Sequence, residues 1–304
     1  PSADAPPEEQ TDEHWRAFNL AWKDVLLGLR VVDPACGSGA FLVAAYDFLA
    51  AQYEKLNEYL SRLGEEQVDL TEAILHHNLF GVDLNAESVE ITKLSLWLKT
   101  AVRGRKLTDL DRNIRQGNSV VSDVEAHPLA FDWAAGDLVA ELTFSGLEHL
   151  TPEQIAVQQR WAEGFDAVLG NPPYVRQEWL DEKSKAHWRK TFACHAGAAD
   201  LYVYFFEQGL KLCKPGGVLG FITNNKWLRA GYGEPLRNWL AGEMTVEQLV
   251  DFGHARIFEG TDTFPAVIVA RRQAPNPDAP APVQVCVLPR EVMEPEKLGE
   301  IGRA

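Results

Sequence analysis

The chain has 304 residues, with 29 Lys and Arg against 44 Asp and Glu, so its formal net charge is −15 at pH 7. Apolar residues make up 46% and charged residues 24%, close to the average of soluble globular proteins, which argues against a disordered or fibrous chain. No apolar run reaches the roughly 18 residues that a membrane-spanning helix needs. The acidic, proline-rich first residues lack the features of a signal peptide. We therefore expect a cytoplasmic protein without a membrane partner, in which residues 1–16 form an acidic tail.

Neither a disulfide framework nor a metal site is expected. The four cysteines, Cys36, Cys194, Cys213 and Cys286, lie far apart in the sequence and form no C-x-x-C pair. The histidines show no ligand spacing either. The thiols should therefore be reduced and mostly inert.

The charge is unevenly distributed. Residues 1–164 carry 13 basic and 27 acidic side chains, a balance of −14, whereas residues 165–304 carry 16 and 17, a balance of −1. Because phosphate binding depends on local cation density, any surface that meets a polyanion is expected in the second half.

Helices and strands are predicted to alternate along the chain, which favours an α/β fold with a doubly wound, mostly parallel sheet. In chain order we expect a helix over 15–28, a strand over 29–33, helices over 40–60 and 69–77, a strand over 79–83, a helix over 86–100, strands over 113–116 and 165–170, a helix over 200–213, and strands over 218–222, 246–252 and 264–270. A Pro/Ala linker over 273–283 and a short apolar run over 283–288 follow.

Ligands bind at the carboxyl ends of the strands in an open parallel sheet, so residues that end strands are the candidate site. The first is Asp33, followed by a glycine turn that enters a helix, where backbone amides can approach an anionic group. Leu42 stands where a dinucleotide fingerprint has its third glycine, and Gly-Lys-Ser/Thr is absent, so neither NAD nor ATP is favoured. An ordinary tight turn is the alternative.

Asp83 ends the next predicted strand, where a carboxylate can accept both hydroxyls of a ribose. Its distance from Gly39 is 44 residues, against the usual ~20, which fits an inserted helix between the two motifs. A solvated Asp at the end of a strand is the alternative.

The sharpest motif is Asn171-Pro172-Pro173-Tyr174, directly after a predicted buried strand. The Asn171 side-chain oxygen and the Pro172 carbonyl are acceptors on a backbone stiffened by two prolines. Two acceptors suit an exocyclic amine, because they pull its nitrogen toward tetrahedral geometry and localise the lone pair for attack. Tyr174 offers an aromatic face for a planar base or amide.

Five segments together resemble the S-adenosylmethionine-dependent DNA adenine-N6 methyltransferases, and above all the catalytic part of the large fused restriction-modification enzymes. These segments are DPACGSGAF (33–41), GVDLN (81–85), GNS (117–119), DAVLGNPPYV (166–175) and DLYVYFFE (200–207). The resemblance implies a Rossmann-like catalytic domain over 17–272 and a start of a following element over 273–304. It also implies that double-stranded DNA is bound through a recognition domain absent from these residues, and that a nuclease is fused or a separate partner.

The resemblance also implies roles for single residues. The methionine part of the cofactor would be surrounded by Asp33, Ala35, Cys36, Gly37, Gly39 and Phe41, its nucleoside would meet Asp83, Leu84 and Asn118, and Phe205 would face the cofactor. Asn171 and Pro172, stiffened by Pro173, would accept hydrogen bonds from N6 of a flipped adenine, between Tyr174 and Phe258. The methyl group would pass directly to nitrogen, so no cysteine nucleophile is needed.

Two other readings stay open from the residues alone. One is a methyltransferase that acts on an RNA base or a protein glutamine through the same N-P-P-Y site; the other is a cofactor-binding scaffold without catalysis. The segment Arg176–Lys190, with five basic residues and two tryptophans, is either a surface for phosphates and bases or a solvated helix face.

Overall fold

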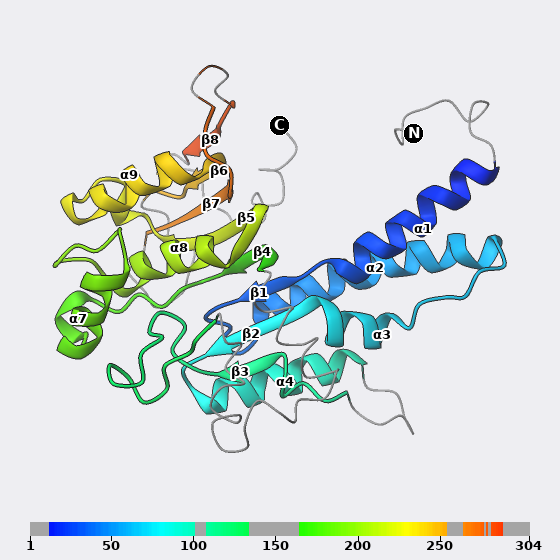
Figure 1. The fold of residues 1–304 in the computed structure, drawn as a ribbon, viewed down its shortest axis with the longest axis horizontal. Coiled ribbons are helices and arrows are strands. Elements are labelled where there is room, and N and C mark those ends of the chain that lie inside the picture. The colour runs from blue at the N-terminus through cyan, green and yellow to red at the C-terminus, as the bar shows by residue number, and fades with distance from the viewer. Residues whose placement is uncertain are drawn as a thin grey trace, which may run out of the picture. The chain divides into compact units, whose positions relative to one another are not determined.

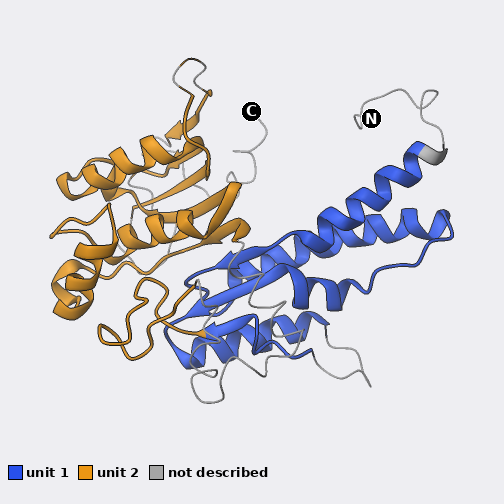
Figure 2. Cartoon of the chain, viewed as in Figure 1, with its two compact units in different colours: residues 1–115 blue, residues 116–304 orange. Residues whose placement is uncertain are grey.

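The computed structural model describes residues 12–100, 108–133, 164–253, 264–276, 278 and 281–287 (Figure 1). The chain divides into two compact units, Pro1–Arg115 and Gln116–Ala304 (Figure 2). Both units contain strands with flanking helices, and the described strands number eight. The α/β fold class predicted from the sequence is confirmed.

The first described element of unit 1 is helix α1 (Asp12–Gly28), so residues 12–16 of the expected tail are helical. Its elements continue with β1 (Val31–Asp33), α2 (Ala40–Arg62), α3 (Leu70–Ala73), a π-helical turn η2 (Ile74–Asn78), β2 (Leu79–Asp83) and α4 (Ala86–Thr100). Strand β3 (Ile114–Gln116) crosses into the second unit. The helix expected between the first two strands is thus present as α3 and η2.

Strands β1 and β2 pair in parallel, with Val31 opposite Leu79 and Asp33 opposite Gly81. All three residues of β1 are buried, and α2 packs against β1 and β2 as well as against α1 and α4. Six side chains at helical spacing form the buried face of α2: Leu42, Tyr46, Leu49, Tyr53, Leu56 and Leu60. The parallel register brings the carboxyl ends of both strands, Asp33 and Asp83, to the same edge.

Unit 2 contains β4 (Phe165–Gly170), a 3-10 turn η4 (Gln177–Trp179), α7 (Glu182–Thr191), α8 (Leu201–Leu212), β5 (Cys213–Asn224), 3-10 turns η5 (Asn225–Leu228) and η6 (Gly231–Gly233), α9 (Glu234–Glu243), β6 (Thr245–Asp251), β7 (Pro265–Arg271) and β8 (Gln284–Val287). Helix α9 was not predicted. Strand β5 begins at Cys213, five residues before the predicted strand, directly where α8 ends.

The sheet of unit 2 is mixed. Strand β4 pairs with β5 in parallel, with Ala167 opposite Val218, whereas β7 runs antiparallel to both β5 and β6. Strand β8 adds to β6 in parallel. The parallel β4–β5 pair, joined through α8, is the part that carries the predicted catalytic motif at its carboxyl end.

Candidate functional site

Hydrogen bonds to strand β2 and helix α4 hold the glycine turn of unit 1, residues 34–39. The Cys36 amide donates to Val82 O (3.0 Å), and the Gly37 amide donates to Asp83 Oδ2 (2.9 Å). The Thr92 hydroxyl of α4 donates to Gly37 O (2.8 Å). Strand β2 and helix α4 therefore fix the turn that follows β1, which brings together Asp33, Gly37 and Asp83 as the sequence predicts.

Two glycines in this turn have different surroundings. Gly39 has φ +83°, and a Cβ added there would lie 2.9 Å from Thr92 Oγ1 and 3.2 Å from Thr92 Cα. Gly37 has φ +53°, but a Cβ added there would meet nothing within 4 Å. A side chain at position 39 would collide with Thr92, so glycine is required there by the packing of the protein. No protein atom occupies the space beside Gly37, so a ligand can approach the backbone there.

The turn carries two carboxylates. Asp33 is 1% exposed and accepts a hydrogen bond from the Ala35 amide (2.9 Å). Burial is the main cause that raises the pKa of Asp33 to about 7; the hydrogen bond from the Ala35 amide lowers the pKa and the nearby charge of Asp83 raises it, and the value includes both effects. Asp83 Oδ1 accepts from the Asn85 amide (2.9 Å). A cationic ligand beside the turn would relieve the cost of this buried negative charge.

The residues around these carboxylates differ in exposure. Phe41 is 37% exposed and Leu84 is 48% exposed, so both offer apolar surface. Cys36 is buried, and its sulfur would lie 3.2 Å from a Cβ at Gly81, so the lack of a side chain at Gly81 makes room for it. Burial, with the charges of Asp33 and Asp83, raises the pKa of the Cys36 thiol.

Helix α2 begins beside this turn without a capping side chain: Gly39 is its N-cap and makes no side-chain hydrogen bond. Backbone amides in the first turn of a helix have no partner within the helix, and the helix dipole favours an anion there. The turn thus lies between two carboxylates, Asp33 and Asp83, and an uncapped helix N-terminus. A ligand with two positive charges and one negative charge would be complementary to these groups.

Asn118 lies in unit 2, in a tight loop after β3. The backbone N–H of Asn118 donates to Leu129 O (2.6 Å), and its side-chain Oδ1 accepts from the backbone N–H of Val120 (3.3 Å). A Cβ at Gly117 would lie 2.6 Å from Phe131, which explains why glycine precedes it. Phe205, on α8, is 5% exposed. The roles of Asn118 and Phe205 toward a cofactor stay predictions, and Phe258 lies outside the described residues.

The motif Asn171–Tyr174 directly follows β4. Asn171 is exposed and Pro172 is buried, so a packed backbone presents the amide side chain to solvent. The Tyr174 hydroxyl donates to Asn171 Oδ1 (2.6 Å) and lies 3.4 Å from Ile222 O at the end of β5. The sequence did not predict this hydrogen bond, which orients the amide oxygen and leaves its second lone pair for a ligand.

An aromatic group supports Tyr174. Its ring meets the ring of Tyr202 edge to face, with centroids 6.1 Å apart, and the hydroxyls of Tyr202 and Tyr232 lie 2.7 Å apart. Burial raises the pKa of Tyr174 to about 12, so its hydroxyl keeps its proton and remains a donor at neutral pH. Tyr202 sits in DLYVYFFE, and the spacing of that motif gave no indication of this contact.

The expected surface over Arg176–Lys190 divides into two parts. Trp188 is 2% exposed; its indole donates to Val120 O (2.8 Å) and stacks on Tyr204 with centroids 4.3 Å apart. The expectation that Trp188 contributes a stacking surface is therefore wrong, because α7 turns this side chain into the core. Trp179, in contrast, is 80% exposed.

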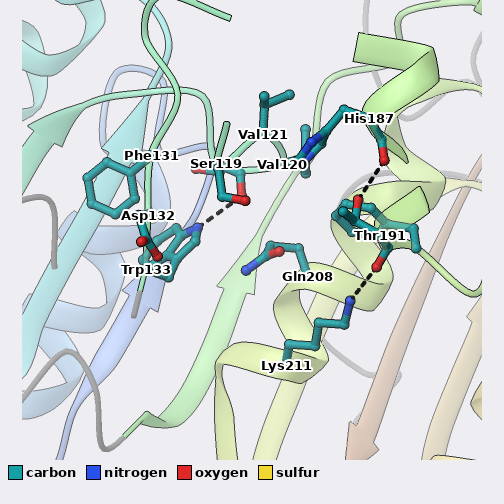
Figure 3. A pocket seen from close by; sticks show the side chains of 12 residues that line it. Ser119, Val120, Val121, Phe131, Asp132, Trp133, His187, Thr191, Gln208 and Lys211 are labelled. Atoms are coloured by element: carbon teal, nitrogen blue, oxygen red, sulfur yellow. Dashed lines mark hydrogen bonds between the residues drawn. The ribbon is translucent and has the colours of Figure 1, made fainter. Parts of the chain in front are cut away.

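A pocket of about 230 Å³ in unit 2 contains none of the predicted site residues (Figure 3). It lies between the loop that follows Asn118 and helices α7 and α8. Trp133 donates to Ser119 O (2.9 Å) on one wall, and Lys211 donates to Thr191 O (3.1 Å) on another, with Gln208 between them. Its lining residues come from this loop and the two helices, and of the quoted motifs GNS (117–119) reaches it, through Ser119.

Within the described ranges, no group of three or more His, Cys, Asp or Glu side chains is placed to hold a metal ion. All four cysteines are free, and Cys36, Cys194 and Cys213 are buried. Burial raises the pKa of Cys213 to about 12 and also that of Cys194, so these thiols are poor nucleophiles at neutral pH. Among the helices that are described, none is long and apolar enough to cross a membrane.

Comparison with known proteins identifies the family. A family model described as Eco57I restriction-modification methylase matches residues 77–258, well over half of the chain. Type II methyltransferase M.XhoI of Xanthomonas vasicola is 31% identical over 208 residues, which cover 64% of this chain and 37% of the relative. The Type II restriction enzyme and methyltransferase RM.Eco57I of Escherichia coli is 23% identical over 272 residues, 82% of this chain and 25% of the relative.

Among solved structures, the Type IIL restriction-modification enzyme MmeI, in complex with DNA, matches with a TM-score of 0.58 and 18% identity. The match covers 85% of this chain and 33% of that one and shows the shared fold. The chain thus spans between a quarter and somewhat over a third of the length of these three proteins. With β2 to β6 inside the matched range, the chain belongs to the Eco57I restriction-modification methylase family.

Proposed function

We propose that this chain carries the catalytic part of a restriction-modification DNA methyltransferase, which transfers the methyl group of S-adenosylmethionine to N6 of an adenine flipped out of DNA. The observation that carries the proposal is the exposed Asn171 at the end of β4, with its amide oxygen oriented by Tyr174 and its backbone anchored by the buried Pro172. Family membership supports the reaction class.

The residues of unit 1 fit the proposed cofactor. S-adenosylmethionine carries an ammonium and a sulfonium, which Asp33 and Asp83 would complement, and a carboxylate, which the uncapped start of α2 would favour. Asp83 would accept from the ribose hydroxyls, and the exposed Leu84 would cover the adenine ring. When bound, the cofactor supplies an electrophilic methyl group with a good leaving group already attached.

The residues of unit 2 would activate the amine. Asn171 Oδ1 and Pro172 O would each accept one N–H of the adenine amino group, which draws its lone pair out of conjugation with the ring. The Tyr174 hydroxyl keeps its hydrogen bond to Oδ1, because an amide oxygen has two lone pairs. N6 would then take the methyl group, with the electron pair of the broken carbon–sulfur bond staying on sulfur, and would give up one proton to water. Positioning and hydrogen bonding supply the catalysis, without a covalent enzyme intermediate.

Double-stranded DNA is the partner that we propose, with the catalytic domain over residues 17–272. The E. coli relative combines restriction enzyme and methyltransferase in its name. A nuclease, fused in the same polypeptide or separate, would be a second partner of the whole protein.

The test is transfer of a labelled methyl group to duplex DNA, followed by analysis of the nucleosides. We expect label on adenine N6 and a loss of at least about 100-fold on Asn171→Ala, the effect typical of removing one preorganised transition-state contact. Asn238→Ala, at an exposed Asn on α9, is the matched control and should leave the rate unchanged. Label on cytosine would reject the proposal. Label on RNA or on protein glutamine, with none on DNA, would show that one of these is the substrate and not DNA.

A further inference from the structure

Trp179 is the most exposed aromatic side chain among the described residues, at 80%. It sits five residues after Tyr174 on η4, whose backbone is fixed by hydrogen bonds from the Trp179 amide to Arg176 O (3.0 Å) and from the Leu180 amide to Gln177 O (3.3 Å). A tight turn directly beyond the catalytic motif thus holds an indole in solvent. Single exposed apolar residues are common in proteins, so exposure of Trp179 alone does not indicate a binding surface.

The second observation is a pair of cations around the same turn. Arg176, on the turn itself, and Lys226, on η5, are both exposed, and neither side chain makes a hydrogen bond or ion pair with a described residue. Burial raises the pKa of Asp200, which accepts from the Gln177 amide (3.3 Å), while the charges of Lys226 and Arg176 lower it. Both cations therefore lie near Asp200 at the base of η4.

The contact between Tyr174 and Ile222 connects this group to the catalytic motif. Ile222 lies two residues before the end of β5, and η5 follows directly with Lys226. Arg176 and Lys226 thus lie on two chain segments that both meet at Tyr174. In a chain of net charge −15, exposed cations that form no ion pair mark a place where a polyanion can approach, even with the carboxylates of Asp200 and Glu178 nearby.

Helix α7 offers cations but no exposed aromatic face. Its Lys183, Arg189 and Lys190 are exposed, whereas Lys185 pairs with Glu182 (2.9 Å) and Trp188 is buried. An exposed aromatic ring beside exposed cations is found at η4 and η5, next to Tyr174.

We propose that Trp179, Arg176 and Lys226 form a DNA contact beside the catalytic motif, in which the indole stacks on a base uncovered when the target adenine leaves the helix and the two cations contact the flanking phosphates. The inference rests on the proposed function. Extruding one base exposes the faces of its neighbours and of its former partner, and an indole can cover such a face whatever the sequence. The contact would favour the flipped state without reading the target.

The experiment measures binding of chain 1–304 to two labelled duplexes at about 50 mM salt by fluorescence anisotropy. One duplex is fully paired, and the other carries an adenine opposite an abasic site, which makes extrusion easy. Trp179→Ala should raise the Kd for the second duplex roughly tenfold, within the range of base–aromatic stacking, and should change the first much less. Trp179→Phe, which keeps an aromatic face, should restore most of the affinity.

The cations have a separate readout. Arg176→Gln and Lys226→Gln should each weaken binding to both duplexes and reduce the slope of log K against log salt by about 0.9, the value for one phosphate contact. Phe48→Ala and Lys55→Gln, at exposed positions on α2, are the matched controls and should change neither affinity nor slope.

Three results would overturn the inference. Trp179→Ala could lower the affinity for both duplexes equally, or for neither; both cation variants could leave the salt slope unchanged; or the chain could fail to bind DNA. Methylation by Asn171→Ala, assayed in parallel, separates the two proposals. If Asn171→Ala abolishes methylation while Trp179→Ala binds like wild type, only this inference fails. If Asn171→Ala methylates normally, the proposed function fails, and the binding data still report on Trp179.

Discussion

The glycine turn of unit 1 and the catalytic loop of unit 2 are both strand ends, but they are built in opposite ways. In the turn, the carboxylates of Asp33 and Asp83 accept three backbone amides between them, and Asp33 is 1% exposed. In the loop, Asn171 is exposed, and the Tyr174 hydroxyl is the hydrogen-bond partner that orients its oxygen. The buried carboxylate beside the turn lowers the stability of the folded state, whereas the orientation of Asn171 in the loop depends on one neighbouring side chain, Tyr174.

This difference indicates where each unit is sensitive. Changes in the turn should alter folding stability and ligand affinity together, because the same groups serve both. Changes in the loop should alter the rate with little effect on stability, because the loop contributes an exposed group. The following variants test that distinction, beginning with the largest expected effect.

Asp33→Asn should stabilise the protein and weaken the cofactor site. The pKa of Asp33 is raised from 3.8 to about 7 by burial, so the folded wild type loses stability as pH rises from about 4 to about 7. The variant should not, and the gap in free energy of unfolding should reach roughly 4 kcal/mol above pH 7. Urea unfolding from pH 4 to 8 measures this gap, while calorimetry should show at least about tenfold weaker S-adenosylmethionine binding.

Asp24→Asn, at an exposed position on α1, is the control and should follow the wild type at every pH. Stability curves for Asp33→Asn and wild type that run parallel across this range would show that Asp33 is not the buried acid that the turn requires.

Gly39→Ala and Gly37→Ala separate the two uses of glycine in the turn. A Cβ at Gly39 lies too close to Thr92, so we expect a loss of roughly 2–3 kcal/mol of stability from strain and overpacking. A Cβ at Gly37 meets only open space and should cost about 1 kcal/mol for its positive φ. Its larger effect should be on cofactor affinity, about tenfold. Equal losses of stability in the two variants would contradict this assignment.

Tyr174→Phe removes the hydroxyl but keeps the ring. We expect kcat to fall roughly fivefold, the equivalent of one net hydrogen bond, with the KM for DNA and the stability nearly unchanged. Steady-state methylation kinetics separate the two constants. Tyr59→Phe on α2 provides the control; a rise in KM without a change in kcat would mean that the hydroxyl binds DNA and does not position Asn171.

The sequence predicted the strand ends well because each carries residues with few other uses. Asp33 before a glycine turn and Asn171 before two prolines are local signals, and both lie where expected in the fold. Most element bounds were predicted within one or two residues, since the apolar periodicity of a buried strand or helix face is also local.

What the sequence could not predict depends on tertiary contacts. Nothing local distinguishes Trp188, buried against Tyr204, from Trp179 in solvent. In the structure Ser184, one helical turn earlier, is also buried, so α7 has an inward face that the sequence does not mark. The antiparallel pairing of β7 with β5 and β6 also depends on chain paths rather than composition. Helix α9 was missed because it is only 10 residues long and contains Pro235 and Gly242, which favour turns in a sequence pattern.

One hydrogen bond, from the Trp188 indole to Val120 O, joins helix α7 to the loop that carries Asn118 two residues earlier. Helix α7 directly follows the turn proposed to contact DNA, and Asn118 is predicted to meet the cofactor. If DNA shifts α7, the loop must respond, and thermodynamic reciprocity then requires that each ligand change the affinity of the other by the same factor. Cofactor and DNA could therefore strengthen or weaken each other's binding through one buried indole.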